Sequence, residues 1–182
     1  MPTRKNIPHT DTQLRIGSQY LIYHIRMYVE TLLWLQSNET RPEGWNTIRN
    51  AILEDNLVHA RILIHFVCNP TKKSRVEYTD VLAWDYFHGR SSVFPLDNEF
   101  LIKQAQDIGG HLVHLTTKAA PNLKSQQEWN IFGIASGLVP ALNQFLEAVP
   151  EERVASGVIS KSLSFLARLS LSEQPDAMSA TT

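Results

Sequence analysis

The chain has 182 residues, 43% of them hydrophobic, and its 17 Lys and Arg nearly balance 18 Asp and Glu, giving a formal charge of −1. A chain of this size can bury one sizeable core, so we expect a single domain over residues 1–171 and a disordered tail over 172–182. The charge balance provides no global positive field toward nucleic acid or an anionic membrane. Cys68 is the only cysteine, which excludes an intramolecular disulfide and fits a reducing compartment.

The first ten residues, MPTRKNIPHT, are polar and lack the apolar stretch of a signal peptide. The longest uncharged stretch, residues 129–146, has the length of a membrane span. Its two Asn, its Gln and Ser, and the central Pro140 make it a poor one. We therefore expect a cytoplasmic protein without membrane contact, in which this stretch is a buried helix.

Hydrophobic periodicity predicts two long helices in the first third of the chain. The first, over residues 12–36, is indicated by apolar side chains at spacings of three and four: Leu14, Leu21, Ile25, Tyr28, Leu32 and Leu35. Pro42 and Gly44 then interrupt the pattern. The second helix, over residues 45–67, is apolar around most of its circumference, which is typical of the central helix of a bundle.

The middle of the chain predicts a long connection and a third helix. Residues 68–95 form the connection, with one short helix in TDVLAWDYF capped by Thr79 or Asp80. We expect the aromatic residues of that segment to fold back as a lid on the core. The third helix is predicted to begin after an N-cap at Asp97, with Leu96 and Leu101 as a hydrophobic staple, and to end near residue 118.

Two further helices complete the predicted fold. Ser125 and Glu128 have the spacing of a capping box, so a fourth helix is expected from there to residue 148, with a kink at Pro140. A weaker helix is expected over residues 151–169. The predicted fold is therefore all-α, an antiparallel bundle of four main helices with a weaker C-terminal helix appended.

Polar side chains on the second helix fall into two sets. His59 lies within the apolar arc, and a buried imidazole requires a polar partner from another helix. A stripe at a different angle on the helix carries Asn50, Glu54, Arg61 and His65. This stripe is either a solvent face or the lining of a cleft in which Arg61 binds an anionic group while Glu54 orients it. His59 is correspondingly either a core histidine or part of a site.

Three polar residues on the third helix allow a metal site. Asp107, His111 and His114 stand on successive turns, and ligands of these types suit zinc or another divalent metal. Gly109 and Gly110 loosen the helix between them, and Lys118 would repel a cation. The favoured interpretation of the same residues is a helix flank or an interface. Motifs for phosphates, dinucleotides, paired CxxC metal sites and nucleophile elbows are missing, so we expect no cofactor.

The stretches ILEDNLVHARILIHF and HLVHLTTK resemble a family of uncharacterised bacterial all-helical proteins. That family carries a glutamate followed by a His-Ala-Arg-like triplet on one helix, and a His-Leu-Thr triplet near the end of a later one. Glu54, His59 and Arg61 match the first motif, and the triplet at residues 114–116, which begins with His114, matches the second. The resemblance covers the second and third helices and implies no particular activity.

A more distant similarity is to the HEPN superfamily, whose active members are metal-independent RNases of toxin and antiphage systems. They use an arginine and a histidine separated by four to six residues on one helix. Arg61 is followed by His65 with only three residues between, so the nuclease reading requires Arg61 to meet His114 across the bundle. His114 would then act as general acid or base and Arg61 would stabilise the phosphate charge, with Glu54 and His59 as supporting residues.

Three hypotheses about function follow. The favoured one is a binding or interaction module with an internal Glu, His and Arg network, whose partner is a second copy or another protein. The alternative is a HEPN-like RNase or nucleotide-processing enzyme, which the lack of a basic excess disfavours. The third is a metal-dependent hydrolase built on Asp107, His111 and His114.

Overall fold

A computed structural model describes residues 9–37, 45–68, 80–87, 94–113 and 129–172. These ranges contain helices and no β-strand beyond one isolated bridge between Cys68 and Leu96, which confirms the predicted all-α class. The helices are α1 (Asp11–Gln36), α2 (Trp45–Val67), α3 (Glu99–Ile108), α4 (Ile131–Ala148) and α5 (Val158–Ser172). Short helical turns are η1 (Ala83–Phe87), η2 (Gly109–Val113) and η4 (Glu151–Arg153). The tail predicted over 172–182 lies outside the described ranges, except for its first residue in α5.

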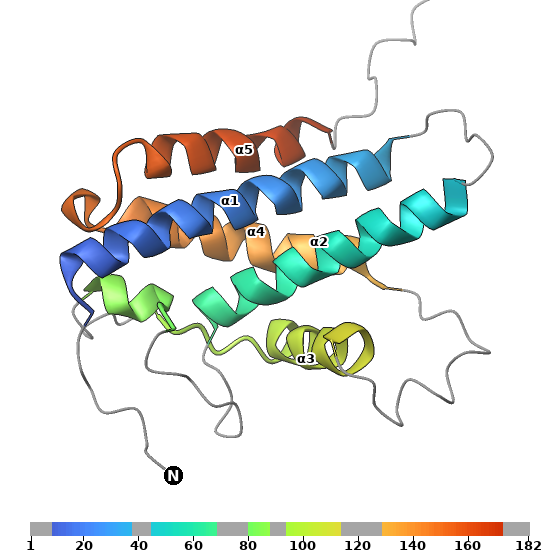
Figure 1. Cartoon of the computed structure of the whole chain (residues 1–182), viewed down its shortest axis with the longest axis horizontal. Helices are drawn as coiled ribbons and strands as arrows, with labels where there is room; N and C mark the ends of the chain where they lie inside the picture. The colour runs from blue at the N-terminus through green and yellow to red at the C-terminus, as the bar shows by residue number, and fades with distance from the viewer. Residues whose placement is uncertain (1–8, 38–44, 69–79, 88–93, 114–128, 173–182) are drawn as a thin grey trace, which may run out of the picture.

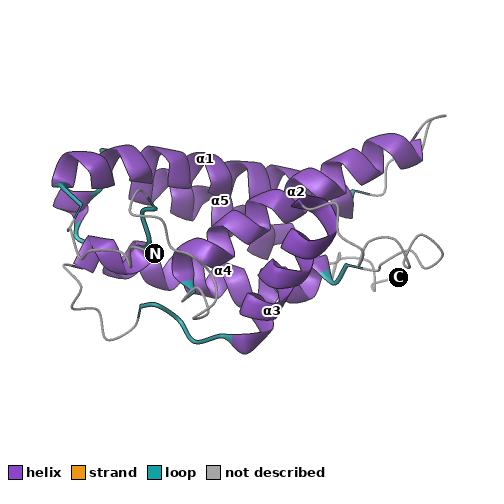
Figure 2. Cartoon of the chain, turned by 60° about the horizontal axis from the view of Figure 1, so that its bottom comes forward, coloured by secondary structure: helices purple, strands orange, loops and turns teal. Residues whose placement is uncertain are grey.

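Four helices, α1, α2, α4 and α5, run along the long axis and surround the core (Figure 1). Each contacts two neighbours in a closed ring: α1 with α2, α2 with α4, α4 with α5, and α5 with α1. The hairpin partners α1 and α2 are antiparallel, as are α4 and α5, whereas α1 and α5 run parallel (Figure 1). Helix α3 lies crosswise against α2 and α4 (Figures 1 and 2). The fifth helix is thus a full member of the bundle, and α3 lies outside this alignment.

Helix α1 begins at a capping box that its sequence, Thr-Asp-Thr-Gln, encodes. The Thr10 hydroxyl accepts from the Gln13 backbone N–H at 3.2 Å, and the Gln13 side chain accepts from the Thr10 N–H at 2.8 Å. Ser18 interrupts the apolar stripe of this helix and is fully buried. Its hydroxyl donates to the Arg15 carbonyl and accepts from the Ala155 N–H, so it links α1 to the segment before α5.

Helix α2 has the predicted bounds, whereas α3 and α4 begin later than predicted. The cap of α3 is Asn98, whose side chain accepts from the Leu101 N–H at 3.1 Å, and the prediction of Asp97 was wrong by one residue. Helix α4 begins after Asn130, which caps the Gly133 N–H, so the proposed start near Ser125 was wrong. Ser125 itself lies outside the described residues. Both caps are short side chains in an extended or non-helical backbone, as capping requires.

The predicted aromatic lid is confirmed in part. Tyr86 of η1 is fully buried and packs edge-on against Phe66 and Phe145, while its hydroxyl donates to the Leu14 carbonyl at 2.8 Å. Phe87 joins the same aromatic cluster. Among the described helices, α4 alone is long and apolar enough to cross a membrane, and in this fold it packs against α2, α3 and α5.

Candidate functional site

The residues of the predicted internal network lie in three different environments. Glu54 is exposed, and His59, which is 5% exposed, faces α1. Arg61 is partly buried and lies against Gly109 in η2, because two residues on a helix rotate the side chain by about 200°. The described residues therefore do not join Glu54, His59 and Arg61 in one network. His114 lies outside the described residues.

His59 has the polar partner that its burial predicts, and that partner is His24 of α1. The two Nδ1 atoms are 2.8 Å apart, which is the distance of a hydrogen bond. The Nε2 of His59 lies 3.5 Å from the Asp55 carboxylate one turn earlier on α2. The ring of Tyr23 packs edge-on against both imidazoles, with centroid distances of 5.3 Å to His24 and 5.6 Å to His59.

This arrangement selects the tautomers of the pair. The Asp55 carboxylate favours a proton on the Nε2 of His59, which leaves the Nδ1 of that ring as an acceptor. The Nδ1 of His24 then donates, and its Nε2 remains an acceptor. Burial lowers the pKa of His24, and the neighbouring His59 lowers it further. Burial also lowers the pKa of His59, against the opposing effect of Asp55. The pair is thus held neutral near pH 7.

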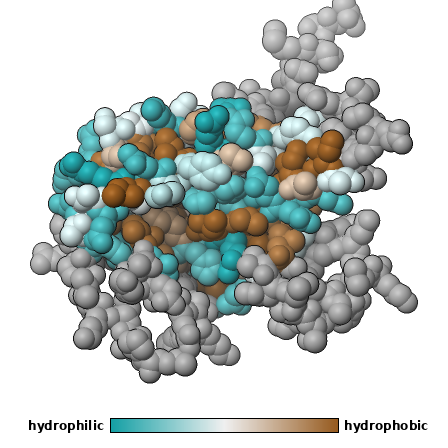
Figure 3. Space-filling view, in the orientation of Figure 1, coloured by the Kyte–Doolittle hydropathy of each residue, from teal (hydrophilic) through white to brown (hydrophobic). Residues whose placement is uncertain are grey.

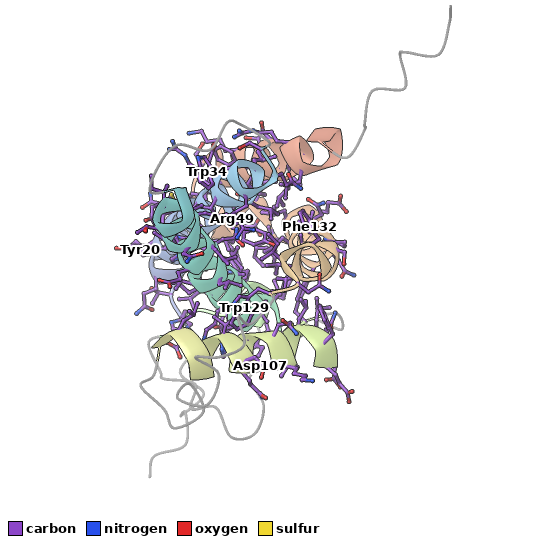
Figure 4. All side chains as sticks on the ribbon, turned by 90° about the vertical axis from the view of Figure 1, so that its right-hand side faces the viewer. Tyr20, Trp34, Arg49, Asp107, Trp129 and Phe132 are labelled. Carbon is purple, nitrogen blue, oxygen red and sulfur yellow. The ribbon has the colours of Figure 1, made fainter. Side chains whose placement is uncertain are left out.

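Exposed hydrophobic side chains lie on α1 and α2, the two helices that carry the histidine pair. On α1 they are Ile16, Tyr20 and Tyr23, at spacings of four and three. On α2 they are Val58 and Ile62, one residue before and three residues after His59. We call these five residues the α1–α2 face. Figure 3 shows hydrophobic side chains interrupting the polar surface where α1 and α2 lie. Figure 4 shows Tyr20 on this side of the molecule and Phe132 of α4 on the opposite side.

A second polar group lies where α2 meets η2. A Cβ at Gly109 would stand 3.1 Å from the Arg61 Nε, so the guanidinium packs directly on the glycine backbone. The described residues give this buried Nε no hydrogen-bond partner. His65, one turn further along α2, has its pKa lowered by burial first and by Arg61 second, against Asp80. η2 is a π-helical turn that begins at Gly109, where the glycine pair was expected to loosen the helix.

The predicted metal ligands are only partly described. Asp107 lies on α3, away from Tyr20 (Figure 4). The side chain of His111 and all of His114 lie outside the described residues. Within the described ranges, no group of three His, Cys, Asp or Glu side chains could hold a metal ion. The metal hypothesis therefore stays a prediction.

Sequence reasoning identified His59 but missed His24 and the exposed face around it. A signal was present, because Ile16, Tyr20 and Tyr23 follow spacings of four and three on the side of α1 that faces away from its buried stripe. Apolar side chains on the solvent side of a helix indicate a second contact surface. The comparisons with known proteins add no assignment: no family model, no curated protein and no solved structure matches this chain significantly.

Proposed function

We propose that the protein is an interaction module that acts through its α1–α2 face, and that a second copy of the chain is the partner that fits this face. The observation that carries the proposal is the exposure of two neighbouring aromatic side chains, Tyr20 at 65% and Tyr23 at 52%, on the same side of α1 as Ile16 at 50%. Tyrosine is among the residues that most often supply binding energy at interfaces, because it offers a large rigid surface with a polar tip.

The size of the face supports a protein partner. Taking about 200 Å² for each side chain, the exposed parts of its five residues present on the order of 500 Å². The largest apolar patch of a typical monomer is about 300–600 Å² and often functional. A standard interface buries about 800 Å² on each partner, so the face supplies most of one and a polar rim supplies the remainder.

Charge and shape favour a second copy over a charged partner. The five residues of the face carry no formal charge, so the face itself offers no ion pair to a basic or an acidic protein. The whole chain has a formal charge of −1, so two copies repel each other little. Two antiparallel helices can also pack on the same pair of a second copy around a two-fold axis, which yields a four-helix contact.

Sedimentation equilibrium of the full chain over a range of concentrations tests the proposal. The wild type is expected to dimerise, and Tyr20→Asp is expected to raise the dimer Kd at least about thirtyfold, or about 2 kcal/mol, because both copies carry the change. Phe132→Asp is the matched control, since Phe132 is 56% exposed on the opposite side (Figure 4). A wild type that is monomeric throughout, or equal weakening by both variants, would contradict the proposal.

One observation favours a second candidate, the HEPN-like RNase. Arg61 packs on Gly109, five residues before His114, so the arginine lies against the element that leads to the histidine of the other motif. In this proposal Arg61 stabilises charge on a phosphate and His114 transfers the proton.

Incubation with a mixed RNA pool tests this candidate, using wild type, Arg61→Ala and His114→Ala with and without a chelator. Chelator-resistant cleavage by the wild type, lost in both variants at unchanged thermal midpoint, supports it. A wild type that does not cleave RNA contradicts this candidate. His24→Ala is the control that should keep full activity, because His24 lies on the other side of α2 from Arg61.

A further inference from the structure

The histidine pair lies beneath the α1–α2 face and has three protonation states, of which only two preserve the hydrogen bond between its Nδ1 atoms. At a separation of 2.8 Å, the Nδ1 atoms of His24 and His59 hold one proton between them, one nitrogen donating and the other accepting. The neutral pair satisfies this condition, and so does the pair that carries one additional proton on an outer nitrogen. The doubly charged pair does not, because both Nδ1 atoms are then donors.

We propose that a second additional proton, which leaves both imidazoles positively charged, opens the contact between α1 and α2 at His24 and His59. The opening thereby weakens self-association through the α1–α2 face. The inference rests on the proposed function for its effect on association, while the opening of the contact is a property of the single chain. Two imidazolium rings at this distance lose their hydrogen bond and gain a like-charge repulsion in a partly buried position.

The charged groups around the pair stabilise a second additional proton only weakly. From α2, Asp55 faces His59 and favours its charged form, but its side chain is 43% exposed and solvent screens it. From α1, Tyr23 contributes an aromatic edge rather than a charge. Burial acts in the opposite direction on both histidines and is the largest influence on each. Asp55 therefore stabilises the single positive charge of the hydrogen-bonded pair, and no second carboxylate among the groups acting on the pair stabilises another charge.

The pair is coupled to the binding face through direct contacts. Tyr23, a member of the face, packs its ring against both imidazoles. Val58 adjoins His59 in the chain, and Ile62 stands one turn beyond it. Separation of the two rings consequently displaces Tyr23 relative to Val58 and Ile62. A two-fold interface that requires these side chains in one arrangement then loses complementarity.

The direction of the pH dependence follows from the lowered pKa values. A histidine whose pKa is lower in the folded than in the unfolded state binds its proton more readily after unfolding. The stability contributed by the pair is therefore complete above about pH 6.5, the value for an unperturbed histidine, and is lost as the pH falls through the folded-state values. Because the sites interact, those values belong to the pair and not to either residue.

The test measures the full chain at pH 7.5 and pH 5.0. Imidazole NMR signals report protonation, backbone amide shifts of Tyr23 and Val58 report the contact, and sedimentation equilibrium reports the dimer Kd. In the wild type we expect coupled titration of His24 and His59 below pH 6.5, movement of both amide signals, and at least a tenfold rise in Kd at pH 5.0. His24→Gln, which cannot be charged, should reduce the rise in Kd to less than threefold.

Two controls separate the outcomes. His65→Gln removes another histidine of lowered pKa, on the α3 side of α2, and should behave like the wild type. His59→Asn provides a second non-titrating variant if His24→Gln folds poorly by circular dichroism. A rise in Kd that survives in the non-titrating variant overturns the proposal, as does a pair that titrates independently at pH 6.5. If the wild type is monomeric at both pH values while the amide signals still move, the proposed function fails and the acid-sensitive contact stands.

Discussion

Replacement of Arg153 by methionine should destabilise the protein far more than the same change at Arg168. Arg153 is 4% exposed and lies in η4. Its Nη1 donates to the carbonyls of Asp85 at 3.2 Å and Tyr86 at 3.1 Å, and its Nε and Nη2 lie 3.2 Å from the Asp11 carboxylate. One side chain thus ties the start of α1, the turn η1 and the approach to α5 together.

The expected loss of stability depends on which hydrogen-bond partners of Arg153 stay shielded from water after the substitution. The side chain of Asp11 is 69% exposed and regains solvent, so the loss of its ion pair with Arg153 contributes little to the destabilisation. The two carbonyls lose charge-assisted bonds, one in a buried and one in a partly buried position, at about 1–1.5 kcal/mol each. Methionine retains most of the packing of the stem. We therefore expect the free energy of unfolding to fall by about 2–3 kcal/mol.

Arg168→Met is the matched control. Arg168 pairs with Glu30 at 2.6 Å, but both side chains are more than 40% exposed, so solvent screening limits the loss to below about 1 kcal/mol. Urea unfolding followed by far-UV circular dichroism measures both variants. With a slope of about 2 kcal/mol per molar urea, Arg153→Met should lower the midpoint by about 1–1.5 M. If it lowers the midpoint no more than Arg168→Met does, the assignment of Arg153 as a buried tie is wrong.

Two further outcomes can be checked on the same protein. Gly110→Ala should raise the free energy of unfolding by about 0.5–1 kcal/mol, since its Cβ meets no atom within 4 Å. Gly109→Ala should raise it less, because its Cβ would stand 3.1 Å from Arg61. Urea midpoints compare the two variants, and equal gains in stability would refute the contact between Gly109 and Arg61. Burial raises the pKa of the Cys68 thiol to about 11, so a thiol reagent at pH 8 should label it only after unfolding; rapid native labelling would show the site to be open.

Several features of the fold could be predicted because they depend on each helix alone. The bounds of α2 and the buried stripe of α1 follow from the repeat of apolar residues, since a helix can bury one face only if that face is apolar. The burial of His59 and its need for a partner follow from its position on that face. The glycine pair also predicted a loosened helix at residues 109 and 110, and the π-helical turn η2 begins at Gly109.

Other features could not be read from one helix at a time. Asp97 and Asn98 are both good caps, and only the final path of the chain into α3 selected Asn98. The sequence likewise gave no sign that α5 lies beside α1 in parallel, as the pairing of Arg168 with Glu30 and of Ala155 with Ser18 requires.

The sequence by itself determined that the chain is helical, which face of each long helix turns inward, and that His59 is a polar group in an apolar setting. Only the tertiary structure decided that His24 is its partner, that Arg61 turns to Gly109 instead, and that exposed residues of two helices form one face. Periodicity records how a helix divides its own surface between core and solvent. It does not record which neighbour covers that surface, because helix pairing depends on the packing of the whole core at once.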